Sequence, residues 1–432
     1  MINIVTGDGE TGSLIVNHKS INKIAFTGST EVGRKIRYET AGTGKSLTLE
    51  LGGKSPYIVF DDADIDSAIE GLVDSIWFNQ GQVCCAGSRL LVHETIAKKF
   101  YKKLKSRMNR LRIGDPLDKS IDMGAIVDLK QLNVVTKLVN KNVHEGKVYQ
   151  PNIKMPTKGC YYPPTLITEM EPSASLMQEE IFGPVLVSTT FRTPEEAIAL
   201  ANNSKYGLAA SIWTENINLA LGIAPKLECG VVWINSVNQF DAAAGFGGKR
   251  ESGFGREGGL EGLSGYVQPR IKTTILKKQK RYKRPISTSY SADSLDKTLK
   301  LYIGGKQVRP DSGYSKPVFG PKGFITHVGD GNRKDIRNAV EAAHKAESWG
   351  KTSGHLKAQI LYYLAENLDQ RSAEFVESIL LSTGAKKEVA KKEVEASISR
   401  LFYYAAWADK FDGAVHDVPI RGVTLAMNEP LG

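Results

Sequence analysis

Short runs of β-branched and aromatic residues alternate with segments of helical periodicity from residue 1 to about residue 275, and this alternation most constrains the fold. Residues 65–77 are typical of the helical segments, because Ile65, Ile69 and Ile76 recur on one face. Strands are expected at residues 23–26, 47–49, 57–60, 208–213 and 230–234, and a second helix at 194–203. Strands and helices that alternate in this way predict an α/β fold.

The alternation ends at a basic and polar stretch, residues 277–297. Six positive side chains lie close together at its start: Lys277, Lys278, Lys280, Arg281, Lys283 and Arg284. The chain then continues through proline, serine and threonine without periodicity. Residues 279–297 are therefore predicted to form a linker.

A second domain is expected from residue 298 to residue 432. Residues 301–306 predict a hairpin, and amphipathic helices follow, the last with Val394, Ile398 and Leu401 at helical spacing. Helices this apolar need a sheet to pack on, and we find none after them in the sequence. The second domain is therefore expected to be truncated, and the first is expected to begin partway through a domain.

Composition argues against several classes of protein. The 432 residues are 41% hydrophobic and 24% charged, which is ordinary for a globular chain of two or three domains. No apolar run approaches the ~20 residues that cross a bilayer, and the first residues lack a signal-peptide pattern, so no membrane is expected. The four cysteines show neither metal-ligand nor disulfide spacing, which predicts reduced thiols, no metal site and a cytoplasmic location.

The formal net charge of +10 raises the question of nucleic-acid binding. Much of the excess lies in the run at residues 277–284, and elsewhere it is mild and scattered. A solvated linker is the commoner explanation for such a run, and contact with RNA or another anionic surface is the alternative. Nucleic acid is therefore not expected as a partner.

Cys84 is the candidate nucleophile. A thiolate attacks carbonyl carbon well, but an ordinary cysteine with a pKa near ~8.5 is only slightly ionised at neutral pH. A working cysteine therefore lies where backbone N–H groups or a helix end favour the anion, and Gly81 and Gly87 would allow such close approach. For an arbitrary pair such as Cys84 and Cys85, burial as small apolar side chains is the commoner case.

Two further signals accompany this cysteine. Glu50 stands at a strand end between apolar neighbours, where burial would raise its pKa toward neutrality and suit it to general-base work on water. The alternative is a surface glutamate paired with Lys54. Gly28 and Gly33 lie between a strand and a helix, the geometry in which helix N–H groups hold a pyrophosphate. A single Gly-x-x-x-x-Gly fits an ordinary capped helix about equally well.

Taken in order along the chain, these signals resemble the signature motifs of the aldehyde dehydrogenase superfamily. The motifs are FTGSTEVG at residues 26–33, LELGGKSP at 49–56, GQVC at 81–84, QEEIFGPV at 178–185 and FGGKRESG at 246–253. The resemblance covers residues 1 to about 275 and implies the three-layer α/β fold of that superfamily. It implies three parts: residues 1–51 as the carboxy-terminal part of a Rossmann-type NAD-binding domain, 52–259 as the catalytic domain, and 260–278 as an oligomerisation segment with an edge strand.

The resemblance also implies roles for single residues. Cys84 corresponds to the nucleophile, Glu50 to the base that activates water, and Phe246 to a wall of the aldehyde tunnel. The positions that correspond to cofactor contacts are Gly28, Ser29, Gly33, Gly52, Glu180 and Phe182. Among these, Gly28 and Ser29 match contacts to the pyrophosphate, Glu180 matches the carboxylate that binds the nicotinamide ribose, and Phe182 matches a residue beside the nicotinamide ring.

The implied reaction is NAD(P)-dependent oxidation of an aldehyde to a carboxylic acid. The thiolate adds to the aldehyde, hydride passes to the nicotinamide, and water activated by Glu50 hydrolyses the remaining thioester. NAD is the expected cofactor and NADP the alternative, because the segment that selects between them is not found in the sequence. The expected partners are a small-molecule aldehyde and, in the intact parent, a second copy paired through the strand at residues 271–276.

The second domain resembles the amino-terminal segment of the same superfamily, through residues 301–306, 333–412 and 427–432. Such a truncated second copy, in tandem with the first, resembles the family 16 aldehyde dehydrogenases. The family's oxyanion-hole asparagine segment and its adenosine-ribose lysine segment are not found. The chain is therefore expected to be a fragment with little activity alone, and a permuted unit is the rarer alternative. A non-catalytic tandem scaffold is the alternative function, and the joint presence of Cys84 and Glu50 disfavours it.

Overall fold

The computed structural model describes residues 5–267, 298–410, 413–416, 418–419 and 422–428. The chain forms two compact units, one of Met1–Arg270 with His416–Thr424 and one of Ile271–Val415 with Leu425–Gly432. The edge strand predicted at residues 271–276 and the linker predicted at 279–297 lie outside the described residues.

The first unit begins, among the described residues, with a sheet of three strands. β1 (Lys23–Thr27) and β2 (Ser46–Glu50) run parallel, and β12 (Gly253–Phe254) pairs antiparallel with the other edge of β2. Two helices accompany them, α1 (Gly9–Asn17) and α2 (Thr30–Thr40). β12 falls within the range predicted for the catalytic domain, so the first two predicted domains share this sheet.

A sheet of seven strands forms the centre of the same unit in the described part of the chain. Its strands are β3 (Pro56–Val59), β4 (Arg89–His93), β5 (Lys147–Tyr149), β6 (Thr165–Thr168), β7 (Val185–Phe191), β9 (Ala209–Trp213) and β10 (Val231–Ile234). They lie in the order β10-β9-β3-β4-β7-β6-β5, and the pairs are parallel except for β5 with β6. Two short strands, β8 (Tyr206–Gly207) and β11 (Lys249–Arg250), pair separately. The parallel sheet bears out the predicted α/β fold.

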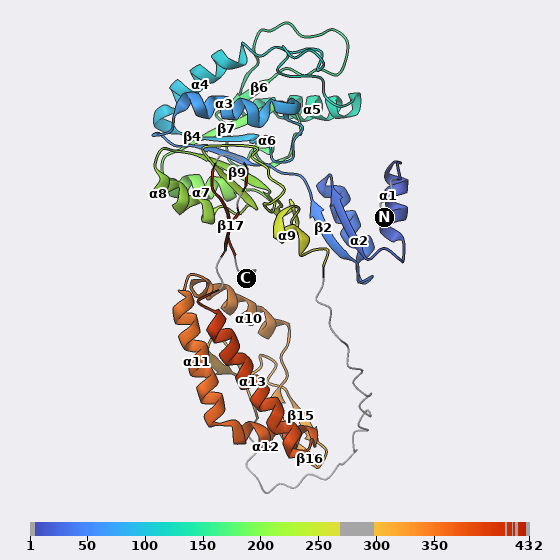
Figure 1. The fold of residues 1–432 in the computed structure, drawn as a ribbon, viewed down its shortest axis with the longest axis vertical. Coiled ribbons are helices and arrows are strands. Elements are labelled where there is room, and N and C mark those ends of the chain that lie inside the picture. The colour runs from blue at the N-terminus through green and yellow to red at the C-terminus, as the bar shows by residue number, and fades with distance from the viewer. Residues whose placement is uncertain (1–4, 268–297, 411–412, 417, 420–421, 429–432) are drawn as a thin grey trace. The chain divides into compact units, whose positions relative to one another are not determined.

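Helices cover both faces of this sheet, as Figure 1 shows for α3 and α4 on one side and α7 and α8 on the other. The helices and 3₁₀ turns of this part are α3 (Ile65–Ile76), η1 (Phe78–Gly81), α4 (Glu94–Met108), α5 (Leu129–Asn142), η2 (Val143–Glu145), α6 (Ser175–Gln178), α7 (Pro194–Asn202), α8 (Ile217–Ile223), η3 (Ala224–Lys226) and α9 (Gly259–Leu263). Side chains alternate along β3, so that Tyr57 packs with α3 and α4 while Ile58 packs with the opposite layer.

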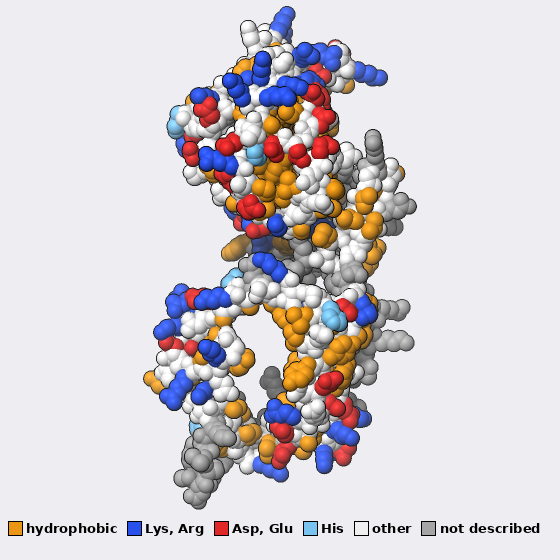
Figure 2. Space-filling view, turned by 90° about the vertical axis from the view of Figure 1, so that its left-hand side faces the viewer, with side chains coloured by type: hydrophobic (Ala, Val, Ile, Leu, Met, Phe, Trp, Pro, Cys, Tyr) orange, Lys and Arg blue, Asp and Glu red, His pale blue; other side chains and the backbone are white. Residues whose placement is uncertain are grey.

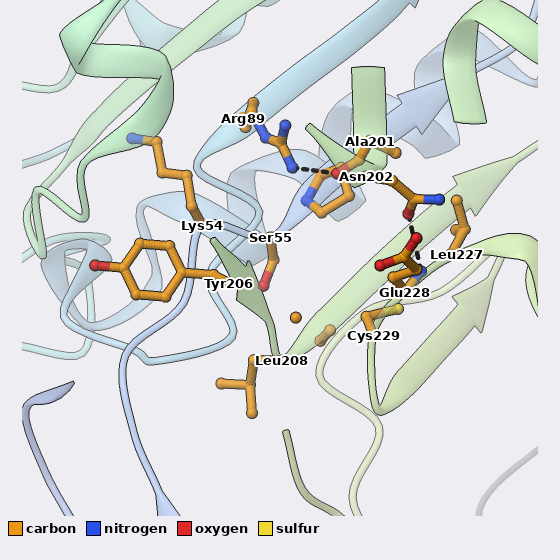
Figure 3. A pocket seen from close by; sticks show the side chains of 13 residues that line it. Lys54, Ser55, Arg89, Ala201, Asn202, Tyr206, Leu208, Leu227, Glu228 and Cys229 are labelled. Carbon is orange, nitrogen blue, oxygen red and sulfur yellow. Dashed lines mark hydrogen bonds between the residues drawn. The ribbon is translucent and has the colours of Figure 1, made fainter. Parts of the chain in front are cut away.

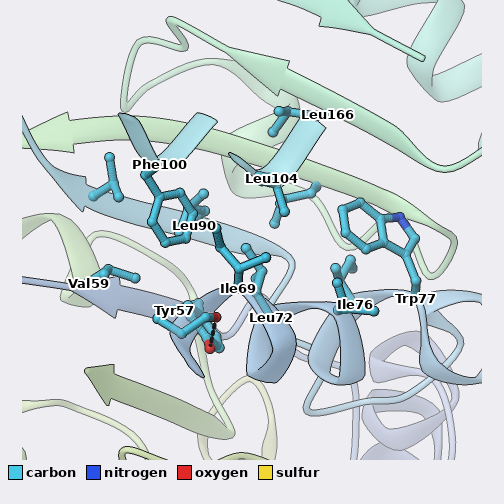
Figure 4. Packing of buried hydrophobic residues seen from close by; sticks show 14 of the residues in the cluster. Tyr57, Val59, Ile69, Leu72, Ile76, Trp77, Leu90, Phe100, Leu104 and Leu166 are labelled. Atoms are coloured by element: carbon cyan, nitrogen blue, oxygen red, sulfur yellow. Dashed lines mark hydrogen bonds between the residues drawn. The ribbon is translucent and has the colours of Figure 1, made fainter. Parts of the chain in front are cut away.

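The layer under α3 and α4 is a dense apolar core (Figure 4). The predicted face of α3 is buried, with Ile69, Leu72 and Ile76 turned toward the sheet. Phe100 and Leu104 of α4 are fully buried in the same cluster. This packing holds β3 and β4 in register, and the loop that carries Cys84 connects α3 to β4.

Replacing Phe100 with alanine is therefore expected to lower the free energy of unfolding by ~3–5 kcal/mol, because it opens a cavity in a close-packed core. Urea unfolding followed by tryptophan fluorescence measures this loss, since Trp77 belongs to the same cluster. Lys99→Ala, at an exposed position on the same helix, is the control and should change the free energy by less than ~0.5 kcal/mol. A loss below ~1 kcal/mol for Phe100→Ala would contradict the close packing of Phe100 in this core.

The second unit consists of hairpins and helices in its described residues. They are β13 (Leu301–Ile303), β14 (Lys306–Val308), β15 (Ser315–Gly320), β16 (Gly323–Gly329), α10 (Arg333–Lys345), η4 (Glu347–Trp349), α11 (Gly354–Gln370), α12 (Ser372–Thr383) and α13 (Lys387–Trp407). Two short strands, β17 (Ala414–His416) and β18 (Thr424–Ala426), each contain a boundary between the two units. The hairpin predicted at residues 301–306 is present as β13 and β14. A small core forms between α12 and α13, around Val376 and Val394.

Much apolar surface of this second unit is exposed, and Figure 2 shows hydrophobic side chains along its helices. The exposed large apolar side chains of α11 and α13 are Leu356, Ile360, Tyr362, Tyr363, Leu364, Val389, Phe402, Tyr403, Tyr404 and Trp407. In the described part of the chain, no helix has the length and apolar character that a membrane span requires.

Candidate active site

Cys84 lies in the turn between η1 and β4. The backbone before it takes three consecutive left-handed conformations, with φ of 47° at Asn79, 58° at Gln80 and 71° at Gly81. Two side-chain amides tie this turn to a neighbouring segment: Gln80 Oε1 accepts the N–H of Gly124, and Gln82 Oε1 accepts the N–H of Val127, both at 3.0 Å. A strained backbone held by surrounding contacts is common where a side chain must be presented to a ligand.

Glu50 is the last residue of β2, and the strands on both sides hold it. Its neighbours across the sheet are Thr27 on β1 and Gly253 on β12. The side chain is only 4% exposed, and neither carboxylate oxygen has a hydrogen-bond partner among the described residues. Lys54 is itself buried, so the alternative of a surface glutamate paired with Lys54 is wrong. A buried carboxylate without partners is costly unless water or a ligand satisfies it.

The double glycine after Glu50 brings the candidate residues together. The Gly53 N–H donates to Glu180 Oε1 at 3.0 Å. A side chain at Gly52 would overlap the Glu180 carboxylate, and one at Gly53 would overlap the carbonyl oxygen of Cys84. Only glycine allows these two close approaches. The structure thus places the Glu50 motif against both the cysteine turn and the Glu180 loop.

The surroundings of Glu50 favour its neutral form. Burial is the largest cause, followed by the negative charge of Glu257, and together with Cys84 they raise the pKa of Glu50 to about 8. The charge of Arg256 and the nearby backbone N–H of Gly248 act in the opposite direction. A carboxyl group with a pKa near neutral pH can both take and return a proton in a catalytic cycle. The interaction between Glu50 and Cys84 is also evidence that the two side chains share one region.

The two adjacent thiols differ in acidity. A hydrogen bond from the Cys85 thiol lowers the pKa of Cys84, although burial opposes this effect. The same contact, together with burial, raises the pKa of Cys85. Cys85 is 2% exposed, and its thiol also has the amide oxygen of Asn238 within reach at 3.5 Å. Of the pair, Cys84 is the thiol that ionises more readily.

Aromatic side chains stand beside the cysteine turn. Phe246 and Cys84 are both half-buried and both pack on the cluster formed by Cys85, Leu208, Ala209 and Trp233. Phe240 continues this surface, with its ring centroid 5.1 Å from that of Phe246 and 5.6 Å from that of Trp233. This aromatic surface can receive the apolar part of a small molecule whose reactive carbon lies at Cys84.

The predicted cofactor residues lie at two places in the unit. Ser29 caps α2, where its Oγ accepts the Val32 N–H at 3.3 Å, and Gly28 donates its N–H to the carbonyl oxygen of Glu50 at 3.0 Å. Gly33 is buried, and a side chain there would overlap Leu51. Phe182 belongs to the Glu180 loop and is 38% exposed with a left-handed φ of 52°. The turn from β1 to α2 is therefore connected directly to Glu50 by a backbone hydrogen bond.

Several residues that support this site were given no role of their own from the sequence. Ser252 is fully buried, and its hydroxyl donates to the carbonyl of Gly52 at 2.6 Å while accepting the Gly207 N–H at 3.0 Å. Arg256 and Glu257 set the charge around Glu50. The spacing of about two hundred residues between Gly52 and Ser252 gives no local signal that they meet.

A pocket lies behind the double glycine, and Figure 3 shows its lining. It is small, with a cavity volume of about 10 Å³, and it is lined by Lys54, Ser55, Pro56, Arg89, Ala201, Asn202, Tyr206, Gly207, Leu208, Ala209, Leu227, Glu228 and Cys229. Arg89 is buried and donates to the carbonyl oxygens of Leu200 and Ala201 at 2.7 and 2.6 Å, at the end of α7. Among the described residues, no group of His, Cys, Asp and Glu side chains has the arrangement of a metal site.

Comparison with known proteins places these residues in a family. The model of the aldehyde dehydrogenase family matches residues 1–272 and 312–432. The chain is 43% identical over 270 residues to the putative aldehyde dehydrogenase DhaS of Bacillus subtilis, which covers 62% of this chain and 54% of that protein. It is 43% identical over 281 residues to retinal dehydrogenase 2 of Mus musculus, covering 64% and 54%. The chain therefore spans about half the length of these relatives.

Solved structures agree with this assignment. An NAD+ complex of an aldehyde dehydrogenase from Bacillus cereus matches with a TM-score of 0.59 and 42% identity, covering 61% of this chain and 54% of that one. An NAD-dependent aldehyde dehydrogenase from Sinorhizobium meliloti matches with a TM-score of 0.60 and 38% identity, covering 61% and 53%. Since the family model covers most of the sequence and the fold agrees, this chain belongs to the aldehyde dehydrogenase family.

Proposed function

We propose that this chain carries the nucleophile and the base of an enzyme that oxidises an aldehyde to a carboxylic acid with NAD. The observation that carries the proposal is the buried Glu50 carboxylate, without partners and close enough to Cys84 for their charges to interact. The names of the relatives support the reaction class. Because the chain spans about half of those relatives, the complete activity is proposed for a protein that contains it.

In the proposed first stage, the Cys84 thiolate forms a bond to the aldehyde carbon and the carbonyl oxygen takes the negative charge. Its lowered pKa supports this role, because more thiolate is then present at neutral pH. Phe246 and Phe240 hold the rest of the aldehyde on the aromatic surface. Loss of hydride from the thiohemiacetal carbon restores the carbonyl and leaves a thioester on Cys84.

In the proposed second stage, Glu50 accepts a proton from water as the water oxygen attacks the thioester carbon. The carbon–sulfur bond then breaks, which releases the acid and regenerates the Cys84 thiolate. The unpartnered oxygens of Glu50 are free to hold this water. The same proton must leave Glu50 before the next cycle.

The residues present fit a dinucleotide. The carboxylate of Glu180 is held by the Gly53 N–H and is placed to accept bonds from ribose hydroxyls, while the exposed ring of Phe182 offers a surface beside a nicotinamide. The capped start of α2, with Gly28 and Ser29, supports binding of a pyrophosphate, and the packing of Gly33 and Gly52 lets backbones approach. When bound, the nicotinamide accepts the hydride. NAD is proposed over NADP because two of the compared structures are described as NAD+-bound or NAD-dependent.

The tandem arrangement is part of the proposal. A family model that matches two separate stretches, residues 1–272 and 312–432, supports a second copy after the first, as in the family 16 aldehyde dehydrogenases. That the chain belongs to a longer tandem protein, that this protein pairs as a homodimer, and that it works in the cytoplasm remain predictions of the sequence. So do the domain boundaries at residues 51, 259 and 278.

Acetylation by p-nitrophenyl acetate tests the proposal without any cofactor. We expect one acetyl group on the peptide that contains Cys84, detected by mass spectrometry, and its loss in Cys84→Ala. Cys160→Ala is the matched control and should leave the acetylation unchanged, because Cys160 packs in a different cluster from Cys84. Equal acetylation of the unaltered protein and Cys84→Ala would overturn the assignment and favour a scaffold without catalysis.

A further inference from the structure

Two asparagines shape the segment that follows β10 and carries Phe240. Asn235 and Asn238 both have left-handed backbones, with φ of 48° and 51°. Asparagine adopts this conformation more readily than most other residues with a side chain. Its amide also offers hydrogen-bond donors and an acceptor at once. Each of the two asparagines therefore turns the chain and leaves an amide that can bind another part of the unit.

Asn235 binds the neighbouring strand of the central sheet. Its Oδ1 accepts the Thr214 N–H at 3.0 Å, and its Nδ2 donates to the Thr214 carbonyl oxygen at 2.8 Å. Its own backbone N–H donates to the carbonyl oxygen of Ile212 at 2.8 Å. These bonds continue the pairing of β10 with β9 and fix the point where the segment leaves the sheet.

Asn238 binds the cysteine turn instead, on both of its sides. Its Nδ2 donates to the carbonyl oxygen of Asp74 at 3.1 Å, and Asp74 lies in the last turn of α3, which leads into the turn. Its Oδ1 accepts the thiol of Cys85 at 3.5 Å, within range of a sulfur donor, and Cys85 directly follows Cys84. One amide thus holds the helix before Cys84 and the residue after it.

The aromatic surface begins two residues beyond Asn238. The Phe240 ring meets Trp233 and Phe246 edge to face, with centroids 5.6 and 5.1 Å away. The indole N–H of Trp233 donates to the carbonyl oxygen of Gln239 at 3.1 Å, which fixes the chain just before Phe240. Asn238 therefore lies between the cysteine turn and the aromatic surface and is bonded directly to the first.

We propose that Asn238 is a positioning residue that sets substrate preference, because its amide ties the aromatic surface to the cysteine turn. Phe240 and Phe246 are thereby held at a fixed place relative to Cys84, which favours aldehydes that carry an aromatic group. An aldehyde with only a methyl group gains little from this surface. The inference rests on the proposed function, which makes Cys84 the nucleophile. Asn238 acts through Cys85 and needs no contact with the substrate.

Two esters with one leaving group distinguish this role from a purely structural one. An asparagine that only capped α3 would affect stability, but not which acyl group Cys84 accepts. p-Nitrophenyl benzoate and p-nitrophenyl acetate differ only in the acyl group and both require the Cys84 thiolate. The ratio of their rates of Cys84 acylation therefore cancels any change in the acidity of Cys84, and mass spectrometry of the Cys84 peptide measures both rates.

Asn238→Gly removes both hydrogen bonds, and glycine accepts the left-handed backbone without strain. We expect the ratio of benzoylation to acetylation to fall about tenfold, because a slight displacement of positioned groups costs this much or more. Phe240→Ala should lower the same ratio, since it removes the ring itself. An unchanged ratio in Asn238→Gly would overturn the proposal, and so would an unchanged ratio in Phe240→Ala.

Asn235→Gly is the matched control. It changes the same residue type in the same backbone conformation, but the lost bonds lead to Thr214, and the backbone bond to Ile212 remains. We expect the ratio to stay as in the unaltered protein, and an equal fall would contradict a special role of Asn238. Thermal unfolding checks that each variant is folded.

A pair of changes at Cys85 tests the route from Asn238 to Cys84. Cys85→Ala removes the donor to Asn238, whereas Cys85→Ser keeps a donor of similar size. The ratio should fall in Cys85→Ala and stay closer to that of the unaltered protein in Cys85→Ser. Equal ratios in the two variants would overturn the proposal, even if Asn238→Gly did not fold. Failure of both esters to acylate Cys84 in the unaltered protein would instead contradict the proposed function.

Discussion

An acetyl group on Cys84 is expected to persist ~10²–10⁴-fold longer in Glu50→Gln than in the unaltered protein, the usual contribution of a positioned general base. Glutamine keeps the size of the side chain but cannot take a proton from water. The reason is structural: Glu50 is buried, its carboxylate oxygens lack partners, and its charge interacts with that of Cys84. The measurement is the decay of the acetylated Cys84 peptide after p-nitrophenyl acetate is removed.

The decay of acetylated Cys84 is also expected to depend on pH. The pKa of Glu50 is raised to about 8, so the basic form is scarce below that pH and prevails above it. The decay rate of the unaltered protein should rise about tenfold per pH unit toward pH 8 and level off beyond it, whereas Glu50→Gln should lack this plateau. Glu70→Gln, a surface change, is the control. Equal lifetimes in Glu50→Gln and the control would exclude Glu50 as the base.

Iodoacetamide at neutral pH is expected to label Cys84 at least ~100-fold faster than the adjacent Cys85, because the thiolate is the reacting form. The Cys85 contact lowers the pKa of Cys84, while that contact and burial raise the pKa of Cys85. Cys85 is also nearly inaccessible at 2% exposure. The labelling reaction is quenched at set times and the labelled peptides are mapped. The Cys85→Ser variant gives the rate of Cys84, and the Cys84→Ser variant gives the rate of Cys85.

The labelling rate of Cys84 by iodoacetamide should also depend on pH. Since the pKa of Cys84 is lowered, its labelling should reach half of its maximum below the midpoint of an ordinary cysteine. Replacing Cys85 with alanine removes the hydrogen bond that stabilises the anion, so the midpoint should move upward. Comparable labelling of both thiols, or a midpoint unaffected by Cys85→Ala, would contradict the acidity order of the pair.

The fold class was predictable from the sequence because its evidence is local. The periodicity of residues 65–77 matches α3, which ends one residue earlier, and the hairpin at 301–306 appears as β13 and β14. The pairing of β12 with β2 was not predictable, because two residues more than two hundred positions from Glu50 carry no periodic signal. The left-handed φ of 112° at Gly253 in β12 is seen in the structure and not in the sequence.

The candidate active site was predictable only at the residues that lie in sequence motifs. Cys84 and Glu50 stood out through neighbouring glycines and Glu180 through its resemblance to a family motif, and the structure brings them to one region through Gly52 and Gly53. The burial of Ser252 and Lys54 was not predictable, although both lie within motifs, because a serine or lysine is usually solvated and its burial depends on distant strands. Roles that depend on tertiary burial cannot be read from residue type.

Glu50 is buried without a hydrogen-bond partner among the described residues, and this affects attempts to raise the thermal stability of the protein. Replacing an orphaned buried acid by glutamine or leucine removes a folding penalty, so a screen for survival at high temperature should enrich changes at this position. The variants selected in such a screen would be more stable but would lack the proposed base. Libraries should therefore hold residue 50 constant and seek gains on the exposed helices of the second unit.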